Sequence, residues 1–193
     1  CAVALYDGEI LDLDEVMPLL ELVSKRSPAH LLLFVKDVTD EAFNLLVTNH
    51  QRGAMKLIVA RSKRFGDEMI NDFNDLALLT GAHYFSKEMR VSLRGIKDEH
   101  LGRARRVEVQ ERTMFVVGGG GASGMVRAKI DEMNQLLQNL LETDAGRSEL
   151  MMRIARLSGS AAVLQVGAVS ETARATLKQH AEKGIKVLRA TVE

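Results

Sequence analysis

Residues 12–25 read "DLDEVMPLLELVSK", and this stretch decides how the chain must fold around it. Asp12 and Glu15 have the spacing of a capping-box-like helix start, with acids near the positive end of the helix dipole. Pro18 follows in the second turn, where it removes one helical N–H bond and bends the axis without preventing the helix. The stretch therefore predicts an amphipathic helix over residues 13–25.

The apolar residues of this helix form two stripes rather than one. At roughly 100° per residue the stripes are rotated by roughly 90° to 100° from each other. The first consists of Val16, Leu19 and Val23, and the second of Leu13, Met17 and Leu20. One stripe is enough for a core, so the other needs a second neighbour.

The segment "TDEAFNLLVTNH" at 39–50 repeats this arrangement. One face carries Ala42, Leu45, Leu46 and Asn49, and an adjoining face carries Phe43 and Val47. Two interpretations are open for the second stripes. Either both stripes are buried in a thick core, or the second stripes point away from the core and line a groove for apolar segments of a partner. Periodicity alone does not decide between them.

Strand-like and helix-like segments alternate along the rest of the chain, which predicts an α/β fold. The predicted strands are 2–5, 31–36, 56–60, 83–86, 106–110, 113–117 and 161–166. The predicted helices are 13–25, 39–50, 67–80, 124–142, 147–157 and 169–193. A hairpin around Glu111-Arg112 indicates a mixed sheet, and Gly81 is a candidate helix C-cap.

Composition excludes several classes of protein. The 193 residues are 46% hydrophobic, and 26 basic residues balance 26 acidic ones, so the basic face of a nucleic-acid module is not expected. Cys1 is the only cysteine, which fits a reducing compartment. The longest apolar run, at 31–35, is far shorter than the ~18 residues of a membrane span. The chain starts within a strand and stops within a helix, so we expect an excised piece of a longer protein.

A glycine pattern at 118–124 is the one motif that suggests chemistry. Gly119, Gly121 and Gly124 have the spacing of a dinucleotide-binding fingerprint. However, two helical segments precede the next strand, which ends in Gly167-Ala168 instead of a ribose-binding acid. We interpret the loop as a flexible turn, with a small α/β nucleotide-binding enzyme as the alternative. We predict no catalytic residue, no metal site and no cofactor, since the histidines are scattered and a Walker-type loop is absent.

Several stretches, taken together and in order, resemble the group I chaperonins of the GroEL type. They are "VMPLLELV" (16–23), "KDVTDEAFNLLVTNHQRG" (36–53), "RFGDEM" (64–69), "LALLTGA" (76–82), "HLGRARRVEV" (100–109) and "RIARLSGSAAVLQVGAVSE" (153–171). The resemblance implies the apical domain of a divergent member, a swivelling β/β/α fold with mixed sheets flanked by helices. It implies an apical, polypeptide-binding domain over 1–168 and an ascending helix over 169–193, without the equatorial ATPase domain.

The resemblance also implies binding residues for the second stripes. They are Met17 and Leu20 on the first helix and Phe43, Val47, Thr48 and Asn49 on the second, and Leu13 joins them by helical geometry alone. Met17 and Phe43 stand where the family commonly has leucine, and Thr48 where it has valine, so this groove has a different shape and one more polar end.

By resemblance, the chain binds non-native polypeptides and the mobile loop of a co-chaperonin, and is not itself an enzyme. The parent protein would form a homo-oligomeric ring that uses ATP and Mg²⁺ in the cytoplasm or an organelle matrix. The fragment would be mostly monomeric, because in this family the ring contacts come mainly from a domain that is absent here. Lys183 falls where the family has the aspartate used in ATP hydrolysis. A lysine cannot act there as a base or a Mg²⁺ ligand, which leaves a parent with altered ATPase activity or a degenerate paralogue as alternatives.

Overall fold

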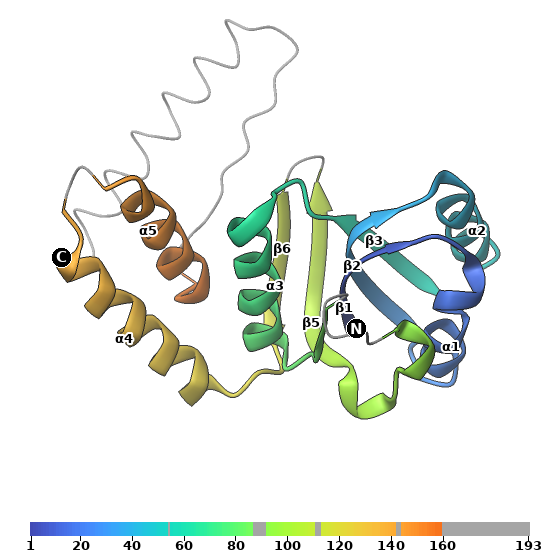
Figure 1. Cartoon of the computed structure of the whole chain (residues 1–193). Coiled ribbons are helices and arrows are strands. Elements are labelled where there is room, and N and C mark those ends of the chain that lie inside the picture. Colours follow the sequence, from blue (N-terminus) through green and yellow to red (C-terminus); the bar gives the residue numbers. More distant parts are fainter. Residues whose placement is uncertain (54, 87–91, 111–112, 142–143, 160–193) are drawn as a thin grey trace, which may run out of the picture.

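The computed structural model describes residues 1–53, 55–86, 92–110, 113–141 and 144–159 (Figure 1). For Leu45, Asn49, Val109, Gln110 and Ala145 it describes the backbone alone. The predicted strand 161–166, the predicted helix 169–193 and Lys183 lie outside the described residues.

A mixed sheet forms the centre of the described chain, in the order β3-β2-β1-β5-β6, with β4 paired to β1. Its strands are β1 (Ala2–Ile10), β2 (His30–Val38), β3 (Lys56–Arg61), β4 (Tyr84–Phe85), β5 (Gly102–Gln110) and β6 (Thr113–Gly119). β1, β2 and β3 are parallel to one another, whereas β5 and β6 are antiparallel. The predicted mixed sheet is confirmed, although β1 and β5 are longer than their apolar runs indicated.

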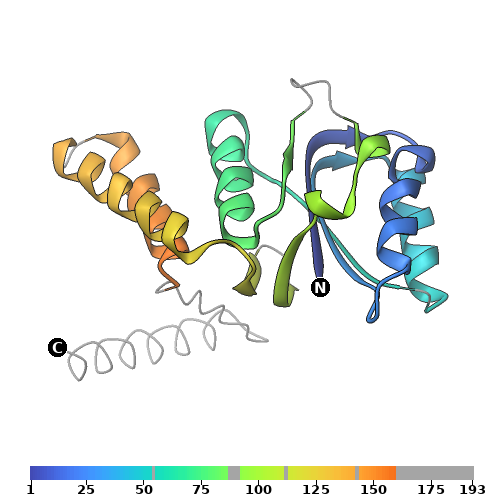
Figure 2. The ribbon, with the colours of Figure 1, turned by 90° about the horizontal axis from the view of Figure 1, so that it is seen from below.

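Helices cover both faces of the parallel strands. They are α1 (Leu13–Ser24), α2 (Asp40–Gln51), α3 (Gly66–Thr80), α4 (Ser123–Asn139) and α5 (Ala145–Leu157), with 3₁₀ turns η2 (Leu93–Gly95) and η3 (Asp98–His100). α1 and α2 cover one face, α3 covers the other, and α4 and α5 lie beyond α3 (Figures 1 and 2). The described helices therefore match the predicted ones to within three residues at each end, and none of them is both long and apolar enough to cross a membrane.

Two apolar clusters hold these layers together, one on each face of the sheet. In β2, Leu31, Leu33 and Val35 pack toward α1 and α2, whereas Leu32 and Phe34 pack toward α3. Successive strand residues point to opposite faces, so a strand buried on both faces must be apolar throughout. This is why "LLLFV" is an unbroken run.

Local capping places the helix ends where the sequence predicts them. Asp12 accepts a hydrogen bond from the Glu15 N–H at 2.9 Å and caps α1, which continues through Pro18. Gly81 caps α3 with a left-handed φ of 72°, and its N–H donates to the Ala77 carbonyl at 2.8 Å. Both predicted caps are confirmed.

Ion pairs that the sequence did not predict attach α5 to α3. Arg153 makes a two-pronged contact with Asp75, at 2.9 Å from Nε and 2.8 Å from Nη2. Only about a tenth of each side chain remains exposed. The hydrogen bond with Asp75 raises the pKa of Arg153 above its usual value, against the opposing effect of burial.

A second, more exposed group of ion pairs lies beside this contact. Glu149 on α5 accepts from Arg64 at 2.7 Å and from Arg156 at 3.1 Å. Arg156 also contacts Asp72 on α3 at 2.8 Å. Because α5 has only one buried leucine, Leu157, these charges supply much of its attachment.

We expect Arg153→Ala to lower the free energy of unfolding by about 3 kcal/mol, because it leaves the Asp75 carboxylate buried without a partner. Chemical denaturation measures this loss. Arg106→Ala is the matched control: its partner Glu108 is well exposed, so the change should cost less than about 1 kcal/mol. Equal losses for the two variants would show that the α3–α5 ion pair is not buried in solution.

Candidate functional site

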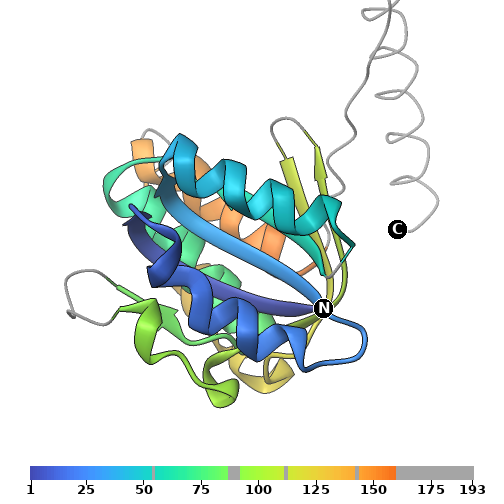
Figure 3. The same ribbon diagram turned by 90° about the vertical axis from the view of Figure 1, so that its right-hand side faces the viewer.

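α1 and α2 lie side by side on the same face of the sheet, as Figure 3 shows looking onto them. Each follows a parallel strand, so both run in the same direction. Ile10 and Val38, the last residues of β1 and β2, are paired in register. Thr39, the N-cap of α2, donates from its N–H to the Ile10 carbonyl and from its hydroxyl to the Leu11 carbonyl, each at 3.0 Å. These bonds hold the two helix starts together.

The first stripe of each helix faces the sheet. Val16, Leu19 and Val23 on α1, and Ala42 and Leu46 on α2, are fully buried in one apolar cluster. The predicted core stripe is confirmed for these residues.

The second stripe of α1 is divided between core and surface. Leu13 and Met17 are half-buried and pack against the core. Leu20 is only 8% exposed and belongs to the core cluster, so the expectation that it points away from the core is wrong. Leu20 is four residues after Val16, about 40° away around the helix, and therefore lies at the edge of the buried side.

The second face of α2 remains at the surface. Phe43 is 41% exposed, and Val47 is half-buried. Thr48 is exposed, and its hydroxyl donates to the Asn44 carbonyl at 2.8 Å, as Thr does within helices. The side chain of Asn49 lies outside the described residues. Leu13 and Met17 on α1, and Phe43, Val47 and Thr48 on α2, thus keep part of their surface exposed on the same side of the sheet. Their binding role stays a prediction.

Leu11 extends this apolar surface and was not predicted. It is 60% exposed and directly precedes the N-cap of α1. An apolar residue at this position commonly packs on the first turns of its helix, which is the signal that could have identified it. Here it is left open at the joined starts of α1 and α2.

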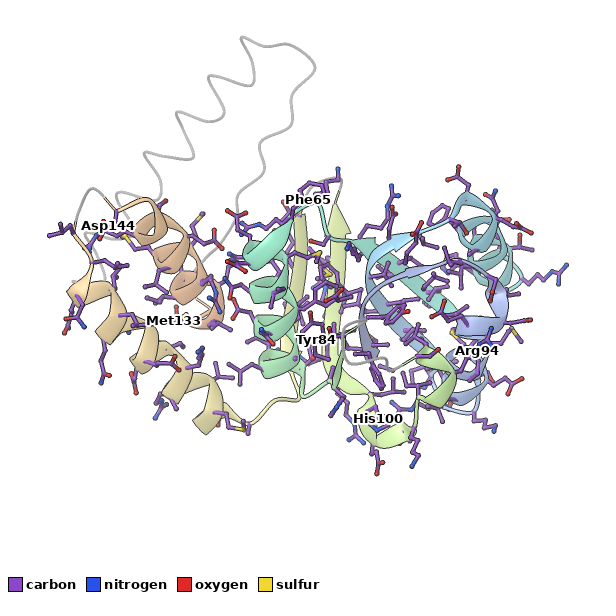
Figure 4. All side chains as sticks on the ribbon, in the orientation of Figure 1. Phe65, Tyr84, Arg94, His100, Met133 and Asp144 are labelled. Atoms are coloured by element: carbon purple, nitrogen blue, oxygen red, sulfur yellow. The ribbon has the colours of Figure 1, made fainter. Side chains whose placement is uncertain are left out.

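Tyr6 supports the start of α1 from the sheet. Its hydroxyl donates to Glu15 Oε1 at 2.8 Å. Burial raises the pKa of the Tyr6 phenol well above its usual value, and the hydrogen bond and charge of Glu15 add to the shift. Arg94 lies beside α1 (Figure 4), and its guanidinium is 3.9 Å from Asp12, with both side chains well exposed.

The glycine loop packs against the carboxyl end of α3 instead of surrounding a cavity. A Cβ on Gly121 would lie 1.9 Å from the Leu78 carbonyl oxygen, and one on Gly119 would lie 2.0 Å from that of Leu79. The Gly121 N–H donates to the Leu79 carbonyl at 3.0 Å, and the Gly120 N–H donates to that of Arg103 at 2.8 Å. Those donors are occupied, and the negative end of the α3 dipole disfavours a phosphate there.

Three further features outside α1 and α2 are a pair of histidines, the arrangement of possible metal ligands, and a surface hollow. His83 and His100, far apart in the sequence, have ring centroids 5.3 Å apart beside Phe85. Within the described ranges, no group of three or more His, Cys, Asp or Glu residues is placed to hold a metal ion. A hollow of about 470 Å³ lies between α3, α4 and α5, and the Arg153–Asp75 pair forms part of its wall.

Comparison with solved structures identifies the fold. No family model matches the chain. The chaperonin gp146 from the bacteriophage EL 2 (Pseudomonas aeruginosa), in crystal form II with ATP-BeFx, matches with a TM-score of 0.52 and 15% identity. The match covers 81% of this chain and 31% of that protein. Crystal form I matches with a TM-score of 0.50, 14% identity and the same coverage.

These matches show a chaperonin-like fold, which confirms the predicted fold class. At this identity they do not distinguish the group I type from other chaperonins. The chain spans about a third of the length of the chaperonin that it matches.

We expect Leu20→Ser to destabilise the protein by about 3 kcal/mol, as much as Val16→Ser, because both place a hydroxyl in the core. Phe43→Ser should cost less stability than Leu20→Ser, since 41% of the Phe43 surface is already exposed. Thermal and urea unfolding measure both. A large loss for Phe43→Ser would mean that its ring belongs to the core.

Gly121 in the loop and Gly124 in the first turn of α4 provide a matched pair of substitutions. Gly121→Ala should lower stability by about 2 kcal/mol, because its methyl group overlaps the Leu78 carbonyl. Gly124→Ala has open space and a helical position in α4, and should raise stability by about 0.5 kcal/mol. Equal effects of the two changes on urea unfolding would contradict the packing of this loop on α3.

Proposed function

We propose that this chain is the polypeptide-binding, apical region of a group I type chaperonin and captures non-native proteins on the apolar surface of α1 and α2. The observation that carries the proposal is the exposure of Phe43 on a helix whose core contacts are already made by Ala42 and Leu46. Phe43 keeps 41% and Leu11 60% of its surface exposed, so apolar area on these helices remains open to a partner.

The surface fits capture of apolar segments for a physical reason. Met17 and Val47 are half-buried, and Leu11 is 60% exposed, so apolar area remains open on α1, on α2 and at their joined starts. Non-native polypeptides expose apolar segments that native proteins hide, and transferring such segments onto this surface removes water from both partners. Methionine adapts its shape to different partners, which suits a surface that takes many clients.

The finer parts of the proposal rest on the resemblance to group I chaperonins. Residues 1–168 would form the apical domain and residues 169–193 the ascending helix. The same surface, with Thr48 and Asn49 at one end, would take the mobile loop of a co-chaperonin. ATP and Mg²⁺ would bind elsewhere in a ring-forming parent, in the cytoplasm or an organelle matrix, with Lys183 altering hydrolysis or marking a degenerate paralogue. The chain itself would not be an enzyme.

The alternative, a nucleotide-binding enzyme that uses the glycine loop, is less well supported. Gly120 and Gly121 donate their N–H groups to protein carbonyls, so these donors are not available to a pyrophosphate. The loop also packs against the carboxyl end of α3, whose negative dipole end disfavours a phosphate there.

The proposal predicts that the chain slows aggregation of an unfolded client without ATP, because holding requires only apolar contact. Phe43→Ser should weaken binding of an apolar peptide about tenfold, since a buried aromatic anchor contributes more than 1 kcal/mol. Light scattering of a denatured client and fluorescence titration of a labelled peptide measure the two effects.

Phe65→Ser is the matched control for this experiment. Phe65 is 83% exposed but precedes α3 on the opposite side of the sheet from α1 and α2 (Figure 4). Peptide affinity should be unchanged in this variant. If the two substitutions weaken binding equally, or if the wild-type chain leaves client aggregation unaffected, the proposed function is wrong.

A further inference from the structure

Exposed carboxylates surround the start of the α1–α2 surface. They belong to the N-cap and first turn of each helix: Asp12 and Asp14 on α1, and Asp40 and Glu41 on α2. Of these four acids, only Asp12 forms an ion pair with a described residue, Arg94 at 3.9 Å. The bonds from Thr39 to Ile10 and Leu11 hold the two groups of acids together.

Basic side chains stand at the other end of the same surface. Lys25 caps the carboxyl end of α1, and Arg52 caps that of α2. Both are exposed, and neither forms an ion pair with a residue that the structure describes. Helix dipoles favour this distribution of charge. Because Asp14, Asp40, Glu41, Lys25 and Arg52 are exposed and form no ion pair with a described residue, their charges also act on a partner.

The two charged ends act independently of each other. α1 and α2 have 12 residues each. At 1.5 Å per residue such a helix is about 18 Å long, more than twice the Debye length of about 8 Å at physiological ionic strength. A segment lying along the helices therefore meets a negative field at one end and a positive field at the other, with apolar contacts between them.

We infer that the α1–α2 surface binds apolar segments with basic residues at one end and acidic residues at the other, and that these charges fix the direction in which the segment lies. The basic end lies over the starts of α1 and α2, beside Asp14 and Asp40. This inference rests on the proposed function, because it concerns the same surface. Apolar contact supplies most of the affinity, whereas charge complementarity selects partner and orientation.

The test uses the 193-residue chain and two synthetic peptides with one apolar core. One peptide carries two lysines at its N-terminal end and two glutamates at its C-terminal end, and the other has these pairs exchanged. Each carries a nitroxide spin label at the lysine end. In both complexes we expect NMR broadening at the amides of Asp14 and Asp40, and much less at Lys25 and Arg52. Since the lysine end is N-terminal in one peptide and C-terminal in the other, this result means that the two peptides lie in opposite chain directions.

Neutralising the acidic end supplies the second arm. Asp14→Asn with Glu41→Gln should weaken binding of the charged peptides about three- to fivefold and reduce its salt dependence, while an uncharged peptide with the same core binds as before. Asp131→Asn with Glu132→Gln on α4 removes two exposed carboxylates elsewhere and should change neither. Thermal melting checks that both variants fold.

The outcomes separate the two proposals. The broadened amides could instead change from Asp14 and Asp40 with one peptide to Lys25 and Arg52 with the other. Both peptides would then lie in the same chain direction whatever their charges, which overturns the inference and leaves the proposed function intact. Equal effects of the two double variants also overturn it. If none of the three peptides binds, the proposed function itself fails.

Discussion

β1 and β2 carry apolar side chains on both faces, so other elements of the chain must cover both faces of the sheet. Val3, Leu5 and Leu32 must be covered by α3, whereas Ala4 and Leu33 must be covered by α1 and α2. The parallel order of the strands requires each to be followed by a returning connection, and helices supply it. α1 and α2 are therefore neighbours because the sheet is parallel and buried, before any partner is considered.

Placing two helices on one face also explains the division of their apolar residues. A helix buries the side that faces the sheet and, where the packing is close, the edges of that side. Leu20 lies at such an edge and is buried, whereas Phe43 lies beyond it and stays 41% exposed. The core and the candidate binding surface are thus adjacent sectors of the same two helices. Residues of the outer sector can change with little effect on the fold.

Much of the fold could be predicted from the sequence because local signals agree with global packing. The run at 31–35, the caps at Asp12 and Gly81 and the two-stripe pattern each act within a few residues of the chain. Helical angles did not predict the burial of Leu20, because they omit how closely α1 packs on its neighbours. The Arg153–Asp75 pair joins residues 78 positions apart, and nothing in either local sequence indicates the other. The sequence also could not show why residues 119 and 121 must be glycine. They must be, because the carbonyl groups at the end of α3 pack directly against them in the folded chain.

The structure separates the ion pairs that join helices on the α3 side from the exposed charges at the ends of α1 and α2 on the other side of the sheet. On the α3 side, Arg64, Arg156, Asp72 and Glu149 neutralise one another and join helices distant in sequence. On the α1–α2 side, Asp14, Asp40 and Glu41 stand at one end of the helices and Lys25 and Arg52 at the other, too far apart to pair across a surface about 18 Å long. Paired charges contribute to attachment, whereas unpaired charges leave a field in the solvent. A partner that docks on α1 and α2 therefore meets apolar side chains and an uncompensated field together, and the same polarity that stabilises each helix start gives the surface a direction.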